Sequence, residues 1–298
     1  MASRPLRVGY VPEHFSTPLY FASKHFGLDV ELLPYPSGTG HMITSLRSGE
    51  IDVGIGLTEG WVAGLGKEDP ETDFHDLIPS KSPSYQIMGT YVETPLCWAI
   101  STGSKRDINC VADIKDGKIG VSRIGSGSYV MGFVLADSQG WLSSSSTPFE
   151  NVPLQTFEKL RKGVNDSTVD FFMWEHFTSK RYYDNGEIKR IGEIYTPWPS
   201  WQIVASYQVA NDNRLNDLFE KIDQGIEYFN KHHDEAVKYI STELDYSEED
   251  AKEWLKTVKF ASKTKGVDIA VVEKTVDILT KAGVLKKGSG LLPKSMIQ

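Results

Sequence analysis

Two acidic residues, Glu59 and Glu175, each follow a short apolar run that predicts a buried strand. A carboxylate at the end of such a strand must be solvated, paired with another group or used by the protein. Two carboxylates in one site can accept hydrogen bonds from an amine, or they can act as a general acid and a general base. We favour binding, because no nucleophile and no set of metal ligands accompanies them in the sequence. The alternative for Glu175 is an ordinary acid near a helix N-terminus, where the helix dipole favours negative charge.

Two turns rich in glycine and hydroxyl side chains each open a predicted helix. Backbone N–H groups at the start of a helix can donate to an acceptor atom of a ligand, although the same residues can serve only to shape the turn and cap the helix. Neither turn has the spacing of a dinucleotide-binding fingerprint or the lysine of a phosphate-binding loop. The first turn contains Gly38, Thr39, Gly40 and His41, and the second contains Gly125, Ser126, Gly127 and Ser128.

Five tryptophans lie near predicted strand ends or near predicted crossings between lobes. A single Trp is more often a core residue, but five at such places predict a flat ring held between aromatic side chains, at about 0.5–1.5 kcal/mol per stacked pair. They are Trp61, Trp98, Trp174, Trp198 and Trp201. The run 232–235 (HHDE) does not predict a metal site, because adjacent residues of a helix point in different directions. We expect no metal and no cofactor.

The elements that would position these residues follow a repeated strand–helix order. Strands are predicted at residues 7–11, 28–33 and 51–55, and each precedes a helix, at 18–26, 39–47 and 58–65. Short links between such units imply a parallel sheet with helices on its faces. A second strand–helix pattern begins at residues 118–122, and the last third of the chain is predicted to be helical. Polar loops are predicted at residues 69–84 and 143–147.

This repetition predicts an α/β protein with two lobes. The first lobe is predicted to contain residues 1–98 and 205–298, and the second to contain residues 99–204. Ligands of open parallel sheets bind beyond the carboxyl ends of the strands. If the lobes face each other, the turns that carry the acids, the glycines and the tryptophans all open onto one cleft.

Composition limits the possible partners. The chain has 298 residues, 40% of them hydrophobic, and a formal net charge of −8 without a basic stripe, which argues against binding to nucleic acid. No apolar run approaches the roughly 20 residues of a membrane helix. The first residues pass directly into a strand without the apolar region of a secretion signal, so a cytoplasmic location is expected. Cys97 and Cys110 are expected to be reduced thiols, and the choice between monomer and homodimer stays open.

Two stretches resemble a known family. RVGYVPEHFSTPLYFASKHFGLDVELLPYPSGTGHMITSLRSGEIDVGIGLTEG, residues 7–60, resembles the opening lobe of type II periplasmic-binding-protein-like proteins, and KIGVSRIGSGSYVMG, residues 118–132, resembles the start of their second lobe. Within that fold, the chain is similar to the superfamily that contains thiamine-pyrimidine synthases and the substrate-binding components for thiamine precursors, aliphatic sulfonates, taurine and nitrate. The similarity is greatest to uncharacterised intracellular fungal members.

The resemblance implies a two-lobed fold in which each lobe is a mostly parallel sheet flanked by helices, with C-terminal helices returning to the first lobe. It also implies ligand contacts at the turns described above, together with Tyr10, His14, Thr58 and Ser101. The fungal pyrimidine synthases have a histidine after the third strand and a cysteine-rich motif, whereas this chain has Thr58-Glu59-Gly60 and no cysteine cluster.

The functional expectation is a protein that closes two lobes on a small heteroaromatic amine, such as a thiamine pyrimidine precursor. The carboxylates would accept from exocyclic N–H groups while tryptophans stack on the ring. An enzyme of thiamine-precursor metabolism is one alternative, and a binding protein for sulfonates or taurine is another. A third alternative is a regulatory protein that keeps the fold without the ligand.

Overall fold

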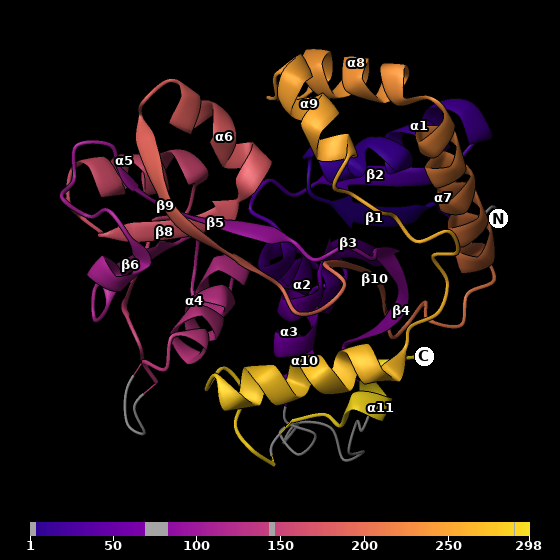
Figure 1. The fold of residues 1–298 in the computed structure, drawn as a ribbon. Helices are drawn as coiled ribbons and strands as arrows, with labels where there is room; N and C mark the ends of the chain where they lie inside the picture. The colour runs from indigo at the N-terminus through magenta and orange to yellow at the C-terminus, as the bar shows by residue number, and fades with distance from the viewer. Residues whose placement is uncertain (1–3, 69–82, 143–146, 289) are drawn as a thin grey trace.

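The computed structural model describes residues 4–68, 83–142, 147–288 and 290–298. In this part of the chain, ten strands form two five-stranded sheets, one in each of two lobes (Figure 1). The two-lobed α/β fold expected from the sequence is therefore confirmed. Most of the two polar loops predicted at 69–84 and 143–147 lies outside the described residues.

The first lobe is built from strand–helix units at the N-terminus. Its sheet has the order β2-β1-β3-β10-β4. The first three predicted strands and helices all occur within two residues of their expected bounds. The elements are β1 (Leu6–Tyr10), α1 (Thr17–Phe26), β2 (Val30–Pro34), α2 (Thr39–Arg47), β3 (Val53–Leu57), α3 (Thr58–Gly66), β4 (Tyr85–Val92) and β10 (Trp201–Ser206), with a 3₁₀ turn η1 (His14–Ser16) after β1.

The second lobe repeats this plan. Its sheet has the order β7-β6-β8-β5-β9. The edge strand β7 (Glu150–Pro153) was not predicted, because it has only four residues and ends at a proline. The other elements are β5 (Cys97–Gly103), η2 (Val111–Ile114), β6 (Lys118–Val121), α4 (Gly127–Ser138), α5 (Phe157–Asn165), β8 (Phe171–Glu175), α6 (His176–Asp184) and β9 (Ile188–Tyr195).

Each sheet contains one reversed strand. β1 pairs in parallel with β2 and β3, while β10 runs antiparallel to both β3 and β4. In the second sheet, β6 pairs in parallel with β7 and β8, while β5 runs antiparallel to both β8 and β9. Four strands of each sheet therefore point the same way, so the carboxyl ends of β1, β3, β6 and β8 can meet at one cleft.

The chain crosses between the lobes twice, at residues 94–96 and 196–200, just before β5 and β10. The two crossings are paired, because Leu96 N donates to Thr196 Oγ1 at 2.9 Å and Thr196 N donates to Leu96 O at 3.1 Å. The predicted lobe boundaries, at residues 98/99 and 204/205, fall inside β5 and β10. The hinge is thus a pair of short segments that are hydrogen-bonded to each other.

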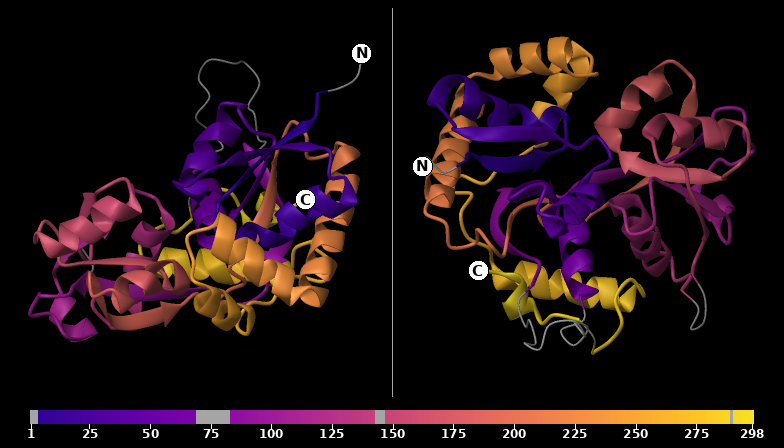
Figure 2. Two further views of the ribbon diagram at one scale, coloured as in Figure 1. Left: turned by 90° about the horizontal axis from the view of Figure 1, so that it is seen from above. Right: turned by 180° about the vertical axis from the view of Figure 1, so that it is seen from behind.

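The C-terminal helices pack mainly on the first lobe (Figure 2). α7 packs against α1 and buries the apolar stripe that the helical spacing predicts, including Leu218, Ile222 and Phe229. α10 lies against α3 and α4, and α9 lies against α6, so both reach across to the second lobe. Within the described ranges no helix is long and apolar enough to cross a membrane. The helices are α7 (Arg214–Lys231), α8 (His233–Glu243), α9 (Glu248–Leu255), α10 (Ile269–Lys281) and α11 (Pro293–Met296).

Candidate ligand-binding cleft

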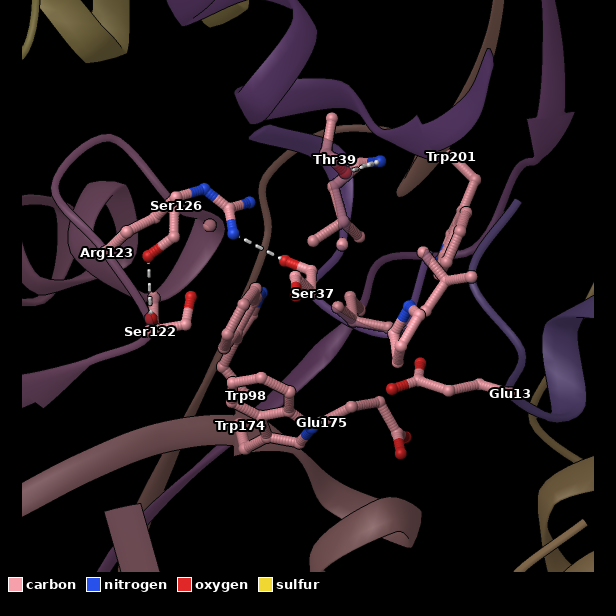
Figure 3. Close-up of a pocket in the computed structure, with 17 residues that line it drawn as sticks. Glu13, Ser37, Thr39, Trp98, Ser122, Arg123, Ser126, Trp174, Glu175 and Trp201 are labelled. Carbon is pink, nitrogen blue, oxygen red and sulfur yellow. Dashed lines mark hydrogen bonds between the residues drawn. The ribbon is translucent and has the colours of Figure 1, made fainter. Parts of the chain in front are cut away.

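A cavity lies between the lobes, at the ends of the strands (Figure 3). It offers about 60 Å³ to the centres of water-sized spheres, and one water needs roughly 10–15 Å³ on that measure. The cavity therefore has room for the few groups of a small molecule. Its lining residues are Val11, Glu13, Pro36, Ser37, Gly38, Thr39, Leu57, Leu96, Trp98, Ser122, Arg123, Ser126, Gly127, Ser128, Trp174, Glu175 and Trp201.

One end of the cavity is formed by two helix N-termini from opposite lobes. α2 begins after Gly38, whose φ of 77° suits glycine, and α4 begins after Ser126. Ser126 Oγ accepts from Tyr129 N at 3.3 Å and lies 3.0 Å from Ser128 Oγ. The N-termini of two helices, together with these hydroxyls, make this end suited to acceptor atoms or to an anionic group.

Arg123 adds a positive charge at the same end. Its Nη1 donates to the backbone oxygen of Ser37 at 2.7 Å, so the side chain reaches from the second lobe to the first. The guanidinium lies against Gly40, where an added Cβ would be 2.7 Å from Nη2. Arg123 forms no ion pair within the described ranges, so its charge is available to a ligand.

The opposite end of the cavity is acidic. Glu175 caps α6, and its Oε2 accepts from Thr178 N at 2.7 Å. Glu13, in the segment between β1 and η1, points into the same part of the cavity from the other lobe (Figure 3). Burial, together with the charge of Glu175, raises the pKa of Glu13 to about 8, and a hydrogen bond from Trp174 opposes the change. Burial likewise raises the pKa of Glu175 to about 7, against the hydrogen bonds at the start of α6.

His14 stands behind the acidic end. The side chain is 1% exposed, and Nε2 lies 3.8 Å from Glu175 Oε2. Its ring packs against Phe15, Tyr246 and Trp254, and neither ring nitrogen has a hydrogen-bond partner among the described residues. Burial lowers the pKa of His14 well below its usual value, so the imidazole is neutral and does not cancel the carboxylate charge.

Aromatic side chains form the walls between the two ends. Trp98, Trp174 and Trp201 line the cavity, and Trp174 stacks on Phe157 with ring centroids 5.1 Å apart. The indole Nε1 atoms of Trp98 and Trp201 are buried and have no partner in the described part of the chain. The walls can therefore offer flat faces and N–H donors to a ligand.

Two of the five predicted tryptophans lie elsewhere. Trp61 is fully buried in the first lobe, where its ring packs edge-on against Tyr85 and covers Gly54. Trp198, in the second crossing, donates from Nε1 to Glu59 Oε2 at 3.0 Å. Both are packing residues of the first lobe and its hinge.

Glu59 differs from the prediction. It is fully buried, and its Oε2 accepts the hydrogen bond from Trp198. Burial raises its pKa to about 7, while that hydrogen bond and a backbone hydrogen bond oppose the change. The acid that faces Glu175 across the cleft is therefore Glu13, because the first turn of α3 directs Glu59 into the hinge.

The remaining predicted residues divide into two groups. Those that line the cavity are Gly38, Thr39, Ser126, Gly127, Ser128, Trp174 and Glu175. Those that do not line it are Tyr10, His14, Gly40, His41, Thr58, Glu59, Trp61, Ser101, Gly125 and Trp198. Several of the second group have local structural contacts: Thr58 donates to Pro199 O, the hydroxyls of Ser101 and Tyr183 lie 2.6 Å apart, and His41 is exposed beside Tyr35.

Glu13 and Arg123 were missed as site residues, although the sequence contains a signal for both. Glu13 follows the first strand closely, as Glu175 ends the strand β8. Arg123 stands between the strand β6 and the glycine turn that opens α4. Glu59 was selected because it follows a strand, and Glu13 and Arg123 follow strands in the same way. Only the direction of the side chain distinguishes Glu59 from the two residues that line the cavity.

The fold and the cleft between its lobes define a protein of the periplasmic-binding-protein fold, which confirms the expected class. A structure described as the Candida albicans CA3427 gene product, which "defines a new family of proteins exhibiting the generic periplasmic binding protein structural fold", is 43% identical to this chain. The match covers 96% of this chain and 92% of the other, with a TM-score of 0.85. The chain belongs to this family, and the model of the Ca3427-like PBP family matches residues 98–194.

More distant structures share the fold. The alkanesulfonate-binding protein SsuA from Xanthomonas axonopodis pv. citri, bound to MOPS, is 16% identical over 100% of this chain and 99% of its own, with a TM-score of 0.78. The aliphatic sulphonate binding protein SsuA from Escherichia coli is 15% identical over 100% of this chain and 92% of its own, with a TM-score of 0.71. A search of curated proteins gives no match.

Proposed function

We propose that the protein binds a small molecule and closes its lobes on a flat, nitrogen-containing group such as a heteroaromatic amine. The observation that carries this proposal is the placing of Glu13 and Glu175, from opposite lobes, beside the faces of Trp98 and Trp174. Carboxylates accept hydrogen bonds from amine N–H groups, and indole faces stack on flat rings.

A thiamine pyrimidine precursor is our first candidate ligand. An aminopyrimidine has a ring that can lie against tryptophan and an exocyclic amino group that can donate to a carboxylate. The indole N–H groups of Trp98 and Trp201, which have no partner among the described residues, can donate to the ring nitrogens, which are acceptors. Each chemical feature of that ligand thus has a counterpart in the cavity.

A sulfonate of the taurine type is the second candidate, supported by the opposite end of the cavity. Arg123, Ser126 and Ser128 lie there beside the N-termini of α2 and α4, which favour anions. The distant relative from Xanthomonas was solved with MOPS, a sulfonate that also contains an amine. Taurine combines an amine with a sulfonate, so that it addresses both ends of the cleft.

An enzyme of thiamine-precursor metabolism is a third candidate. Glu13 and Glu175 have pKa values of about 8 and about 7, and a carboxyl group near the working pH suits general acid–base catalysis. Incubation of the protein with pyrimidine precursors and pyridoxal phosphate, followed by mass spectrometry, separates this candidate from simple binding. Product that disappears in Glu175→Gln would establish turnover.

Calorimetry with three probes tests the proposal. An aminopyrimidine alcohol, taurine and propanesulfonate are titrated into the protein, and the third probe lacks an amine. Binding of the first or second, weakened at least tenfold in Glu175→Gln, supports an amine site. Glu273→Gln is the matched control, because Glu273 is an exposed acid of α10. If only propanesulfonate binds, or if Glu175→Gln binds every probe as tightly as the wild type, the amine site is rejected.

A further inference from the structure

Glu13 and Glu175 form a carboxylate pair across the lobe interface. Glu13 belongs to the segment after β1 in the first lobe, and Glu175 ends β8 in the second. Both side chains line the acidic end of the same cavity, and their carboxyl groups lie beside each other (Figure 3). Because the two acids belong to different lobes, the distance between them depends on how far the lobes are closed.

The cations of α6, the helix that Glu175 caps, are paired with other acids. Lys180 pairs with Asp250 at 3.1 Å and Arg181 pairs with Asp245, both at the contact between α6 and the α8–α9 segment. Neither Glu13 nor Glu175 forms an ion pair with Lys or Arg in the described ranges. The other titratable groups that face the pair are His14, Cys97, Tyr183 and Tyr246. His176 contacts Arg190, which in turn is hydrogen-bonded to Glu193.

None of these titratable neighbours supplies a free positive charge, since Arg190 is paired with Glu193, and Arg123 of the same cavity lies at its opposite end (Figure 3). His14 is neutral because it is buried, and burial raises the pKa of Cys97, of Tyr183 and of Tyr246 above their usual values, so these three are neutral near pH 7. Two carboxylates that share a poorly solvated site cannot both ionise without a large cost, so such a pair retains one proton. Closed lobes therefore need either a proton or a cation between Glu13 and Glu175.

We propose that the interlobe pair Glu13–Glu175 makes lobe closure dependent on charge, so that the cleft closes on a proton or, in preference, on a cationic ligand that takes the proton's place. The proposal rests on the proposed function only in assuming that the cleft takes a small molecule. The step is an ion exchange: the carboxylic acid O–H bond breaks, the proton passes to solvent, and the carboxylate pairs with the ligand cation. No other bond changes.

The sign of the pH dependence follows. The two acids hold protons more tightly when the lobes are closed, since burial raises the pKa of both carboxyl groups and the charge of Glu175 also raises the pKa of Glu13. Closure without a cation is therefore favoured at low pH and is lost as the pH rises through about 7 to about 8. A complex with a cation holds one proton fewer than a complex with a neutral ligand of the same shape. The affinity for the cation, divided by the affinity for the neutral ligand, should therefore rise with pH by up to about tenfold per pH unit below that range.

The first test uses the free protein. Small-angle scattering is recorded between pH 6 and pH 9, and we expect the radius of gyration to rise above the roughly 19 Å of a compact chain of this length. In the double variant Glu13→Gln/Glu175→Gln, the radius should stay constant, because no charge develops. Glu273→Gln should behave as the wild type. A wild-type radius that does not change over this range would overturn charge-dependent closure.

The second test uses benzylamine, which is a cation over this range, and benzyl alcohol, its neutral counterpart. Affinities of both are measured by calorimetry at pH 6, 7 and 8. A ratio that rises with pH in the wild type and is flat in the double variant supports the proposal. A constant ratio in the wild type rejects it while leaving the proposed function intact. Failure of both probes to bind, with the scattering result as expected, rejects the aromatic amine as ligand and leaves charge-dependent closure standing.

Discussion

At the scale of single residues, three acids of this protein, of which Glu59 and Glu175 are buried and Glu13 is half-buried, have different roles because they have different partners. Glu13 and Glu175 face the cleft, whereas Glu59 accepts a hydrogen bond from Trp198 inside the hinge. Burial raises the pKa of all three to about neutral or above. A raised pKa alone therefore does not identify a ligand-binding acid, and the direction of the side chain decides its function.

Glu59→Ala should destabilise the fold rather than weaken ligand binding directly. The substitution leaves Trp198 Nε1 without its acceptor inside the hinge, and an unsatisfied buried donor costs about 1–3 kcal/mol. Urea unfolding measures the loss, and Glu59→Gln, which keeps an acceptor oxygen, should lose less. Equal stability of Glu59→Ala and wild type would show that the Trp198 contact is unimportant.

Stability should fall with pH because of Glu59. The pKa of its carboxyl group rises from 4.5 to about 7 on folding, so its contribution is complete below pH 4.5 and is lost between pH 4.5 and about 7. The expected slope is about 1.4 kcal/mol per pH unit for each such group. Unfolding measured at several pH values should give a shallower slope for Glu59→Gln than for wild type. Parallel curves would contradict this assignment.

Trp174→Ala should weaken binding of a flat ligand with little loss of fold. Trp174 is partly exposed in the cleft and loses a stacking contact of about 0.5–1.5 kcal/mol, which corresponds to roughly 2- to 12-fold in affinity. Ligand affinity is measured by calorimetry, and the stability of the free protein by thermal unfolding, for the wild type and for Trp174→Ala. If the free protein loses as much stability as the complex, Trp174 is a packing residue.

At the scale of elements, the start of α4 fixes how closely the lobes can approach. A Cβ added to Gly127 would lie 2.9 Å from Leu57 Cδ1 and 3.0 Å from Trp98 Cη2, so only glycine allows this contact. Gly127→Ala should therefore hold the lobes apart and reduce ligand affinity, as measured by calorimetry. Gly132→Ala, in the same helix but with its Cβ facing Ile119 of β6, is the control and should leave affinity unchanged.

The elements themselves could be predicted from the sequence more fully than the site. Helix α2 begins and ends at the predicted residues, because a glycine turn precedes it and its apolar positions follow one face. The cavity was only partly predictable, since sequence position places Glu13, Glu59 and Glu175 alike after strands. Which acid faces the cleft depends on the packing of the hinge around Trp198, a contact between residues 139 positions apart. Local patterns do not contain that information.

At the scale of the whole molecule, the C-terminal helices take part in closure. The α8–α9 segment contacts α6 through the hydroxyls of Tyr246 and Thr178, which lie 2.9 Å apart, and α10 contacts α4 through Lys281 and Asp137, whose charged atoms lie 2.9 Å apart. These contacts hold the second lobe from both sides of the cleft, so that the lobes are coupled by more than the two crossings.

Tyr246→Phe should make the closed arrangement less stable. The variant keeps the ring packed on His14 and removes the hydroxyl that contacts Thr178. A net loss of about 0.5–1.5 kcal/mol is expected for one hydrogen bond, which lowers ligand affinity roughly 2- to 12-fold. Calorimetry measures the change, and Lys281→Ala tests the contact between α10 and α4 on the other side of the cleft. Unchanged affinity in Tyr246→Phe would show that the α8–α9 segment does not restrain the lobes.

The pairing of the two crossings has a consequence for protein engineering. Cys97 and Tyr195, the first residue of β5 and the last of β9, are register partners on adjacent strands. Leu96 and Thr196, which flank them, are hydrogen-bonded in the hinge. Residues 97–195 thus form a module with both ends at one place, inserted into a chain that is otherwise continuous in space. Joining Leu96 to Thr196 through a short linker would delete the module from this chain. Because the two ends of the module are adjacent, residues 97–195 could also be inserted into a loop of another protein.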